Sequence, residues 1–201
     1  MSEGMATLTE LDYSFERHFA TEDRDLYLAR RLLPMGLDLR AAPPLPAVQL
    51  APNSPLPDDF RTDLYTLWAY YKTAATLDHL RVSVGEDAFA RAITRYVERC
   101  KYVGCRPNAL REVLEEETGT DLRPFFARWV TGSERPRVLV GFTPVANGAD
   151  VELTKPDDLP MTLELWLELA SGEVLKRRVD LGPRVTRLRL DTPSPVLRVA
   201  A

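Results

Sequence analysis

The stretch Met161-Thr162-Leu163-Glu164-Leu165-Trp166-Leu167-Glu168-Leu169 places an apolar side chain at every second position. Because successive side chains of a β-strand point to opposite faces of its sheet, this alternation predicts a strand with one buried face. Similar short runs, separated by turn-forming pairs such as Asn147-Gly148 and Gly182-Pro183, cover residues 137–142, 150–154, 173–181, 185–190 and 196–200. Six short strands within about 65 residues are typical of a small antiparallel sandwich.

Upstream of residue 131, apolar residues recur with a helical period instead. Between residues 89 and 100 they predict a helix whose core-facing stripe consists of Phe89, Ala92, Ile93, Tyr96, Val97 and Cys100. Comparable patterns predict helices over residues 8–19, after Thr21, from Asp58 or Asp59 to Val84, from 110 to Gly119, and from Thr120 or Asp121 to Val130. The period changes between Trp129 and Val138, so we expect a helical domain over residues 1–131 and a β-sandwich domain over residues 136–201.

Seven prolines between Pro34 and Pro57 interrupt the helical region. Proline lacks a backbone N–H and fixes φ, so a regular helix is excluded there and a central strand is disfavoured. We expect an extended segment that is either a binding loop or a wrap around another part of the protein. Composition does not choose between these two interpretations.

Two further local patterns have simple interpretations. The run Glu115-Glu116-Glu117 is most simply a solvated helix face. The only cysteines, Cys100 and Cys105, are too few for a thiolate zinc site. A local disulfide between them fits because Gly104 can turn the chain, whereas two reduced thiols near a helix end are the simpler interpretation, and both stay open.

Charge and composition exclude several functional classes. The chain has 201 residues, a formal net charge of -4 and a sequence pI near 5.4, so it presents no global basic field for nucleic acid. No apolar run approaches the roughly 18 residues of a membrane helix, and Glu3 stands where a secretory signal would carry positive charge. We therefore expect no nucleic-acid partner, membrane span or export signal, and the compartment stays unknown.

The titratable inventory is too small for a complete histidine-based site. His18 and His79 are the only histidines, and the sequence contains no H-E-x-x-H, phosphate-binding glycine loop or Gly-x-Ser-x-Gly motif. From the residues alone, the chain is a helical domain joined to a β-sandwich.

Three segments, in this order and spacing, extend that interpretation. They are Ser2-Glu3-Gly4-Met5-Ala6-Thr7, Ala69-Tyr70-Tyr71-Lys72-Thr73-Ala74, and the region from Leu110 through Gly119 and Trp129 to Gly132. The first is similar to the W-L-x-E-G-x-A segment and the second to the Y-x-K-G-A segment of the gluzincin zinc aminopeptidases, the membrane alanyl aminopeptidase-like metallopeptidases. Taken together, residues 2–132 resemble the helical second half of a thermolysin-like catalytic domain, which many members of the family follow with a β-sandwich.

The resemblance implies specific roles for two residues. Glu3 matches the third zinc ligand of the family, and Tyr70 matches the tyrosine that stabilises the tetrahedral intermediate of peptide-bond hydrolysis. Other interpretations stay open: Glu3 as an N-terminal acid favoured by the helix dipole, and Tyr70 as a core or surface aromatic. Tyr71 is the rival for the tyrosine role, and His79 is read as an ordinary helix residue.

The sequence departs from the family pattern in two places. It lacks the lobe that carries H-E-x-x-H, and Thr73 replaces the usual Gly after Lys72. We therefore expect a C-terminal fragment of a zinc aminopeptidase-like metallopeptidase, which hydrolyses peptides in the complete enzyme but is inactive and binds no zinc alone. A face left uncovered by the missing N-terminal lobe would favour self-association or cover by the Pro34–Pro57 segment.

Two alternatives belong to other functional classes. One is a non-catalytic protein-binding scaffold of the same fold, in which Glu3 and Tyr70 are relics. The other treats the resemblance as chance and the sandwich as a carbohydrate- or protein-binding module.

Overall fold

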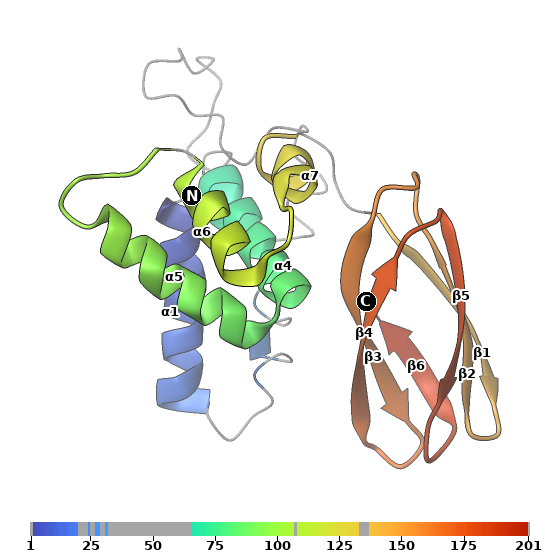
Figure 1. The fold of residues 1–201 in the computed structure, drawn as a ribbon. Helices are drawn as coiled ribbons and strands as arrows, with labels where there is room; N and C mark the ends of the chain where they lie inside the picture. The colour runs from blue at the N-terminus through green and yellow to red at the C-terminus, as the bar shows by residue number, and fades with distance from the viewer. Residues whose placement is uncertain are drawn as a thin grey trace, which may run out of the picture. The chain divides into compact units, whose positions relative to one another are not determined.

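The computed structural model describes residues 2–19, 24, 27, 28, 31, 66–106, 108–132 and 137–200. The chain divides into two compact units, Met1–Arg135 and Pro136–Ala201 (Figure 1). The Pro34–Pro57 segment, Thr21 and the helix start expected at Asp58 or Asp59 lie outside the described residues. Of the helix expected after Thr21, residues 24, 27, 28 and 31 are described, and they are helical.

In the described part of the first unit, all regular secondary structure is helical. Its helices are α1 (Ser2–Ser14), η1 (Phe15–Phe19), η2 (Thr66–Lys72), α4 (Thr73–Val84), α5 (Glu86–Cys100), α6 (Ala109–Thr118), α7 (Arg123–Phe125) and η3 (Phe126–Val130), where η marks a π-helical stretch. Gly119 ends α6 in the left-handed conformation, with φ of 67°. The Asp121 carboxylate accepts the Arg123 backbone N–H at 3.0 Å, but the N-cap of α7 is Leu122, so the expected start at Thr120 or Asp121 is wrong. None of these described helices is long and apolar enough to cross a membrane.

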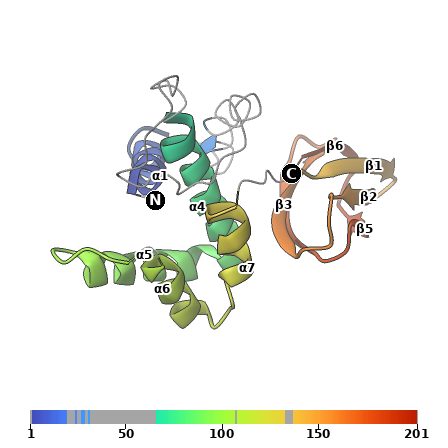
Figure 2. The same ribbon diagram turned by 90° about the horizontal axis from the view of Figure 1, so that it is seen from above.

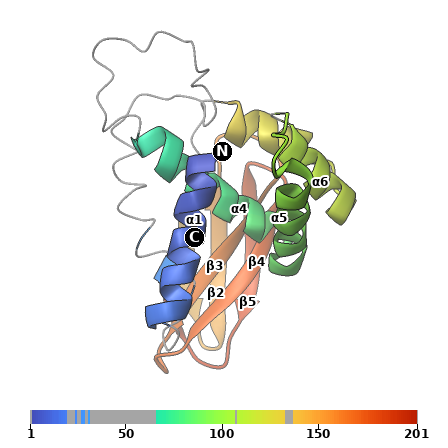
Figure 3. The ribbon, with the colours of Figure 1, turned by 90° about the vertical axis from the view of Figure 1, so that its left-hand side faces the viewer.

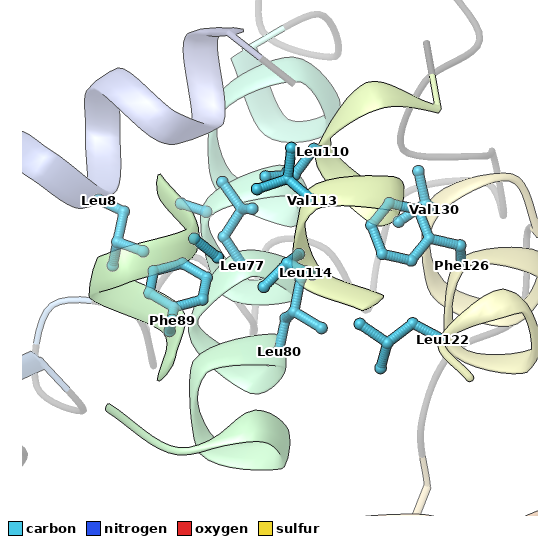
Figure 4. Close-up of a cluster of buried hydrophobic side chains, with 12 residues drawn as sticks. Leu8, Leu77, Leu80, Phe89, Leu110, Val113, Leu114, Leu122, Phe126 and Val130 are labelled. Atoms are coloured by element: carbon cyan, nitrogen blue, oxygen red, sulfur yellow. The ribbon is translucent and has the colours of Figure 1, made fainter. Parts of the chain in front are cut away.

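One apolar cluster holds the helical unit together (Figure 4). Its buried members are Leu8, Ala74, Leu77, Leu80, Phe89, Ala92, Leu110, Val113, Leu114, Leu122, Phe126 and Val130. In Figure 4 the side chain of Leu8 points from α1 toward Leu77 and Phe89. The prediction for Val97 is wrong, because this residue is 51% exposed. Phe89 and Ala92 of the predicted stripe are thus buried in the core, Ile93 and Tyr96 pack against it, and Val97 lies exposed beside it.

The link between α5 and α6 settles the cysteine alternatives. Cys100 and Cys105 form a disulfide with a Cα–Cα distance of 5.1 Å, so the simpler interpretation as two reduced thiols is wrong. Both Gly104 and Tyr102 have positive φ, 69° and 67°. These turns bring the chain back on itself within five residues, which lets the two sulfur atoms meet.

The second unit contains two antiparallel sheets of three strands each. The strands are β1 (Leu139–Val145), β2 (Gly148–Thr154), β3 (Met161–Leu169), β4 (Val174–Leu181), β5 (Val185–Asp191) and β6 (Val196–Ala200). The sheet orders are β1-β2-β5 and β4-β3-β6, and all pairs are antiparallel. Apolar side chains from both sheets share one cluster, so the sheets pack on each other around a common core. The expected α plus β fold is confirmed.

The alternation in β3 places its side chains as its sequence predicted. Met161, Leu165, Leu167 and Leu169 are buried. On the other face, Trp166 is half-buried: its indole N–H donates to Glu164 at 2.8 Å, and the Lys176 ammonium lies 4.9 Å from its ring centroid. The period-two pattern therefore predicted correctly which face of this strand is buried.

Candidate functional site

Helices α1 and α4 come into backbone-close contact at Gly4 and Thr73. Both residues are buried, and a Cβ built on Gly4 would lie only 2.4 Å from the Cβ of Thr73. Because no larger side chain fits at that separation, the close approach requires glycine at position 4. Figure 3 shows α1 passing across the start of α4, in agreement with this contact.

This contact brings together the helices that carry Glu3 and Tyr70. Glu3 is adjacent to Gly4 in the first turn of α1, and Tyr70 lies three residues before Thr73, in η2. Helix α1 contacts η2 as well as α4, so Tyr70 lies on a helix that adjoins α1. Both side chains are half-buried, as is that of Tyr71. The two predicted site residues thus flank one helix–helix contact although they are 67 positions apart in the sequence.

A buried lysine joins the second segment of the resemblance to the third. Lys72 is 9% exposed, and its Nζ lies 3.4 Å from the carbonyl oxygen of Gly132. A Cβ on Gly132 would lie 2.4 Å from the Arg128 carbonyl oxygen, so a side chain there would displace backbone. The end of η3 is therefore fixed next to Lys72, two residues after Tyr70. Sequence reasoning quoted Lys72 and Gly132 but did not foresee that they meet.

A second buried cation, Arg81, was not singled out in the sequence analysis. Arg81 is 4% exposed and pairs with carboxylates from three places: Asp78 one turn earlier, Asp12 of α1 at 3.4 Å, and Glu86 of α5 at 3.5 Å. Arg24 bridges the same two outer carboxylates, at 2.9 Å to Asp12 and 2.8 Å to Glu86. Because Asp12 lies 69 residues before Arg81, no local pattern shows that this cluster reaches α1. It ties α1 and α5 to the helix that follows Tyr70.

The acidic run at residues 115–117 lies at the surface of α6, as predicted, and two of its carboxylates also pair with arginines of α5. Glu117 accepts hydrogen bonds from Arg91 and Arg95 of α5, and Glu116 accepts them from Arg95 and Arg99. The Arg91 hydrogen bond lowers the pKa of Glu117, followed by the Arg95 hydrogen bond. The Arg99 hydrogen bond likewise lowers the pKa of Glu116. Figure 2 shows the two helices that these pairs join, α5 and α6, lying side by side.

Asp121, in the link between α6 and α7, has a strongly lowered pKa. Hydrogen bonds from the side chain and then the backbone of Arg123 lower the pKa of Asp121 to about 2. The Glu115 carboxylate accepts the backbone N–H of Leu122 at 2.9 Å, which fixes the other side of the link. Charge thus holds α6 both to α5 and to the segment that enters α7.

The two histidines lie in different surroundings. His18 is exposed in η1, next to Phe19. His79 is half-buried in α4, with its ring centroid 5.4 Å from that of Phe125 and 5.6 Å from that of Trp129. In the described part of the chain, no three His, Cys, Asp or Glu side chains gather where they could hold a metal ion. A catalytic zinc site takes three protein ligands, so the residues described do not by themselves fit a zinc ion.

The chain is similar to known proteins both in sequence and in fold. Residues 2–129 match the model of the peptidase family M1 domain. A 72-residue stretch, 36% of the chain, is 31% identical to a leucyl aminopeptidase of Saccharolobus solfataricus and covers 9% of that protein. The fold matches a crystal structure of Legionella pneumophila aminopeptidase A in complex with aspartic acid, with a TM-score of 0.65 and 19% sequence identity.

The extent of these matches differs between the two units. The structural match covers 98% of this chain and 22% of the aminopeptidase A chain, so the likeness of fold includes the β unit. The family match ends at residue 129, within the helical unit. This chain therefore spans less than a quarter of the length of either relative. Because the family model matches more than half of this chain, the chain belongs to peptidase family M1.

Proposed function

We propose that this chain supplies the helical half of an aminopeptidase catalytic site, which in the complete enzyme hydrolyses the N-terminal peptide bond of a peptide substrate. The contact between Gly4 and Thr73 carries the proposal, because it sets Glu3 and Tyr70 on adjoining helices. Two structural links support the same geometry. Lys72 joins η2 to the end of η3, and Arg81 joins α4 to α1 and α5.

Glu3 is proposed as one ligand of the catalytic zinc of the complete enzyme. Its carboxylate is a suitable oxygen donor, and its place in the first turn of α1 puts it near the positive end of the helix dipole. Zinc, when bound, activates a water molecule for attack on a carbonyl. Since one carboxylate is not a site, the remaining ligands must come from the lobe carrying H-E-x-x-H, and the chain alone is proposed to bind no zinc.

Tyr70 is proposed as the residue that stabilises the reacting carbonyl oxygen. When water attacks a peptide carbonyl, negative charge develops on that oxygen, and a fixed O–H donor stabilises it most where water is scarce. The half-buried position of Tyr70 suits this role. Tyr71 is also half-buried, so the two tyrosines must be distinguished by experiment.

We propose that the domains are residues 1–131 and 136–201, the first catalytic and the second an accessory β-sandwich. By this proposal the isolated chain is inactive, and the face bearing Glu3 and Tyr70 receives either the missing lobe or another copy of the chain. The names of the two relatives, a leucyl aminopeptidase and an aminopeptidase A, support removal of N-terminal residues as the reaction.

A graft tests the proposal. The segment of Legionella pneumophila aminopeptidase A that this chain matches is replaced by this chain, and circular dichroism verifies folding. The graft should hold one zinc per chain and hydrolyse aminoacyl reporter substrates, whereas the isolated chain does neither. Glu3→Gln in the graft should lose zinc and activity, while Glu10→Gln, an exposed carboxylate of the same helix, should keep both. A folded graft that binds zinc equally well with Glu3→Gln would refute the assignment.

A further inference from the structure

The disulfide between Cys100 and Cys105 lies outside the proposed site and closes an exposed loop. Residues 101–106 are all exposed, with Tyr102 at 99% and Val103 at 79%. Two backbone hydrogen bonds join this loop to the end of α5: the Lys101 N–H donates to Val97 and the Gly104 N–H donates to Cys100. Figures 1 and 2 show the loop extending past the end of α5, away from α4.

The side chains of this loop contribute little to its conformation. An almost fully exposed tyrosine and valine bury little apolar area, so burial does not hold them in place. Tyr102 also has a φ of 67°, a left-handed conformation that is unfavourable for a residue with a Cβ. The disulfide is therefore the main constraint that keeps residues 101–105 in their described conformation.

The helices on either side are held independently of the disulfide. Phe89 and Ala92 of α5, and Leu110, Val113 and Leu114 of α6, belong to the core cluster. Near the loop, Arg95 and Arg99 pair with Glu116 at 3.2 and 2.7 Å. Opening the loop would thus leave α5 and α6 packed, because none of these contacts involves residues 101–105.

We propose that Cys100 and Cys105 form a redox-responsive clasp, which a dithiol reductant opens to release residues 101–105 without unfolding the helical unit. Cys105 is exposed and Cys100 is half-buried, so the Cys105 sulfur is the accessible point of attack. A reductant thiolate attacks it and expels the Cys100 thiolate, which takes up a proton. The second thiol of the reductant then displaces Cys105, and the reductant leaves as its own disulfide. Two electrons and two protons pass to the protein.

The Tyr102–Val103 bond provides a readout of loop opening. The full chain is treated with dithiothreitol, and chymotrypsin cleavage after Tyr102 is followed by mass spectrometry under denaturing, reducing conditions, because the intact disulfide would hold cut pieces together. Reduction should expose both cysteines to alkylation and speed cleavage at Tyr102 at least about tenfold, since cleavage follows the open population. Cleavage at Tyr13 of α1, and the helical circular dichroism, should not change.

A cysteine-free variant separates the clasp from effects of the reductant on the protease. Cys100→Ser/Cys105→Ser should be cleaved rapidly at Tyr102 with or without dithiothreitol. Three results would overturn the proposal: equal cleavage of the oxidised and reduced chain, free thiols in the chain under oxidising conditions, or loss of helical signal upon reduction. The last result would make the disulfide a structural staple of the whole unit.

Discussion

The two units bury a cation in different ways. In the helical unit, Arg81 is 4% exposed and meets carboxylates carried by α1, α4 and α5. In the β unit, Lys155 is 3% exposed, and its ammonium donates to the backbone carbonyls of Asp157, Leu159 and Gly182 at 2.8, 2.7 and 2.8 Å. Each of the three N–H groups of the ammonium therefore has a backbone carbonyl as its hydrogen-bond acceptor.

The partners of each buried cation show which part of its unit the cation stabilises. Lys155 takes two of its three partners from the next four residues, so it fixes a local turn and joins it to the loop after β4. Arg81 takes partners that are 69 residues before it and five residues after it, so it fixes how helices are placed. Placement of helices is what the proposed site requires, because Glu3 and Tyr70 lie on different ones.

The largest effect is expected at Lys155. Lys155→Met leaves three backbone carbonyls without their donor, and an unsatisfied buried acceptor costs about 1 to 3 kcal/mol. Partial rehydration would reduce the sum, so we expect the free energy of unfolding of the β unit to fall by about 3 kcal/mol. Urea unfolding of the full chain measures it. Lys176→Met, which removes only a cation from beside the Trp166 ring, serves as the control, and an equal loss in both variants would contradict the argument.

The contact between α1 and α4 should be nearly as sensitive. Gly4→Ala places a methyl group against Thr73 and should cost about 2 to 3 kcal/mol, the range for overpacking a filled site. Thr73→Gly in the same chain removes the obstructing side chain and should restore part of that loss. A double-mutant cycle in urea measures the coupling. Additive single effects would show that the two residues are not in contact.

Arg81→Met should be somewhat milder than the loss of Lys155. Removing one partner of a buried ion pair usually costs 3 to 5 kcal/mol, but the carboxylates of Asp12 and Glu86 are 28% and 55% exposed and still face Arg24. We therefore expect a loss of about 2 kcal/mol in the helical unit, below the usual cost for a fully buried pair. Arg24→Met should cost less than Arg81→Met, as judged by thermal unfolding, and the reverse order would contradict this ranking.

The smallest expected effect is a loss of folding stability at low pH. The pKa values of Glu116, Glu117 and Asp121 are lower in the folded chain than their ordinary values of 4.5, 4.5 and 3.8. Their contribution to stability is thus complete above the unfolded pKa values and is lost as the pH falls through the folded ones, about 2 for Asp121. Urea midpoints should fall from pH 5 to pH 2. Glu116→Gln/Glu117→Gln should flatten that slope, and an unchanged slope would show that other groups cause it.

The strands of the β unit were predictable because alternation and turn residues are local signals. The pairings of β2 with β5 and of β3 with β6 were not, because these strands are not consecutive in the sequence. In the helical unit, the apolar stripe of α5 correctly predicted that Phe89 and Ala92 are buried. It was wrong for Val97, which is exposed.

The candidate site was predictable only in part. Resemblance proposed Glu3 and Tyr70 as site residues, but it did not indicate that Gly4 meets Thr73 across 69 positions, the contact that brings α1 against α4. Thr73 was noted merely as a departure from the family pattern, whereas the structure shows its side chain filling the space that Gly4 leaves. The ion pairs of Glu116 and Glu117 were likewise hidden, because their arginines lie on another helix.

The most direct test of the central assignment compares two neighbouring tyrosines in the grafted enzyme. Tyr70→Phe removes the proposed hydrogen-bond donor and should lower kcat about 100- to 1000-fold with little change in zinc content, the loss typical of one oxyanion donor. Tyr71→Phe removes the same hydroxyl one residue later and should leave kcat within about threefold, since no transition-state contact is lost. If Tyr71→Phe carries the large loss, or if neither variant does, Tyr70 is not the residue that stabilises the reacting oxygen.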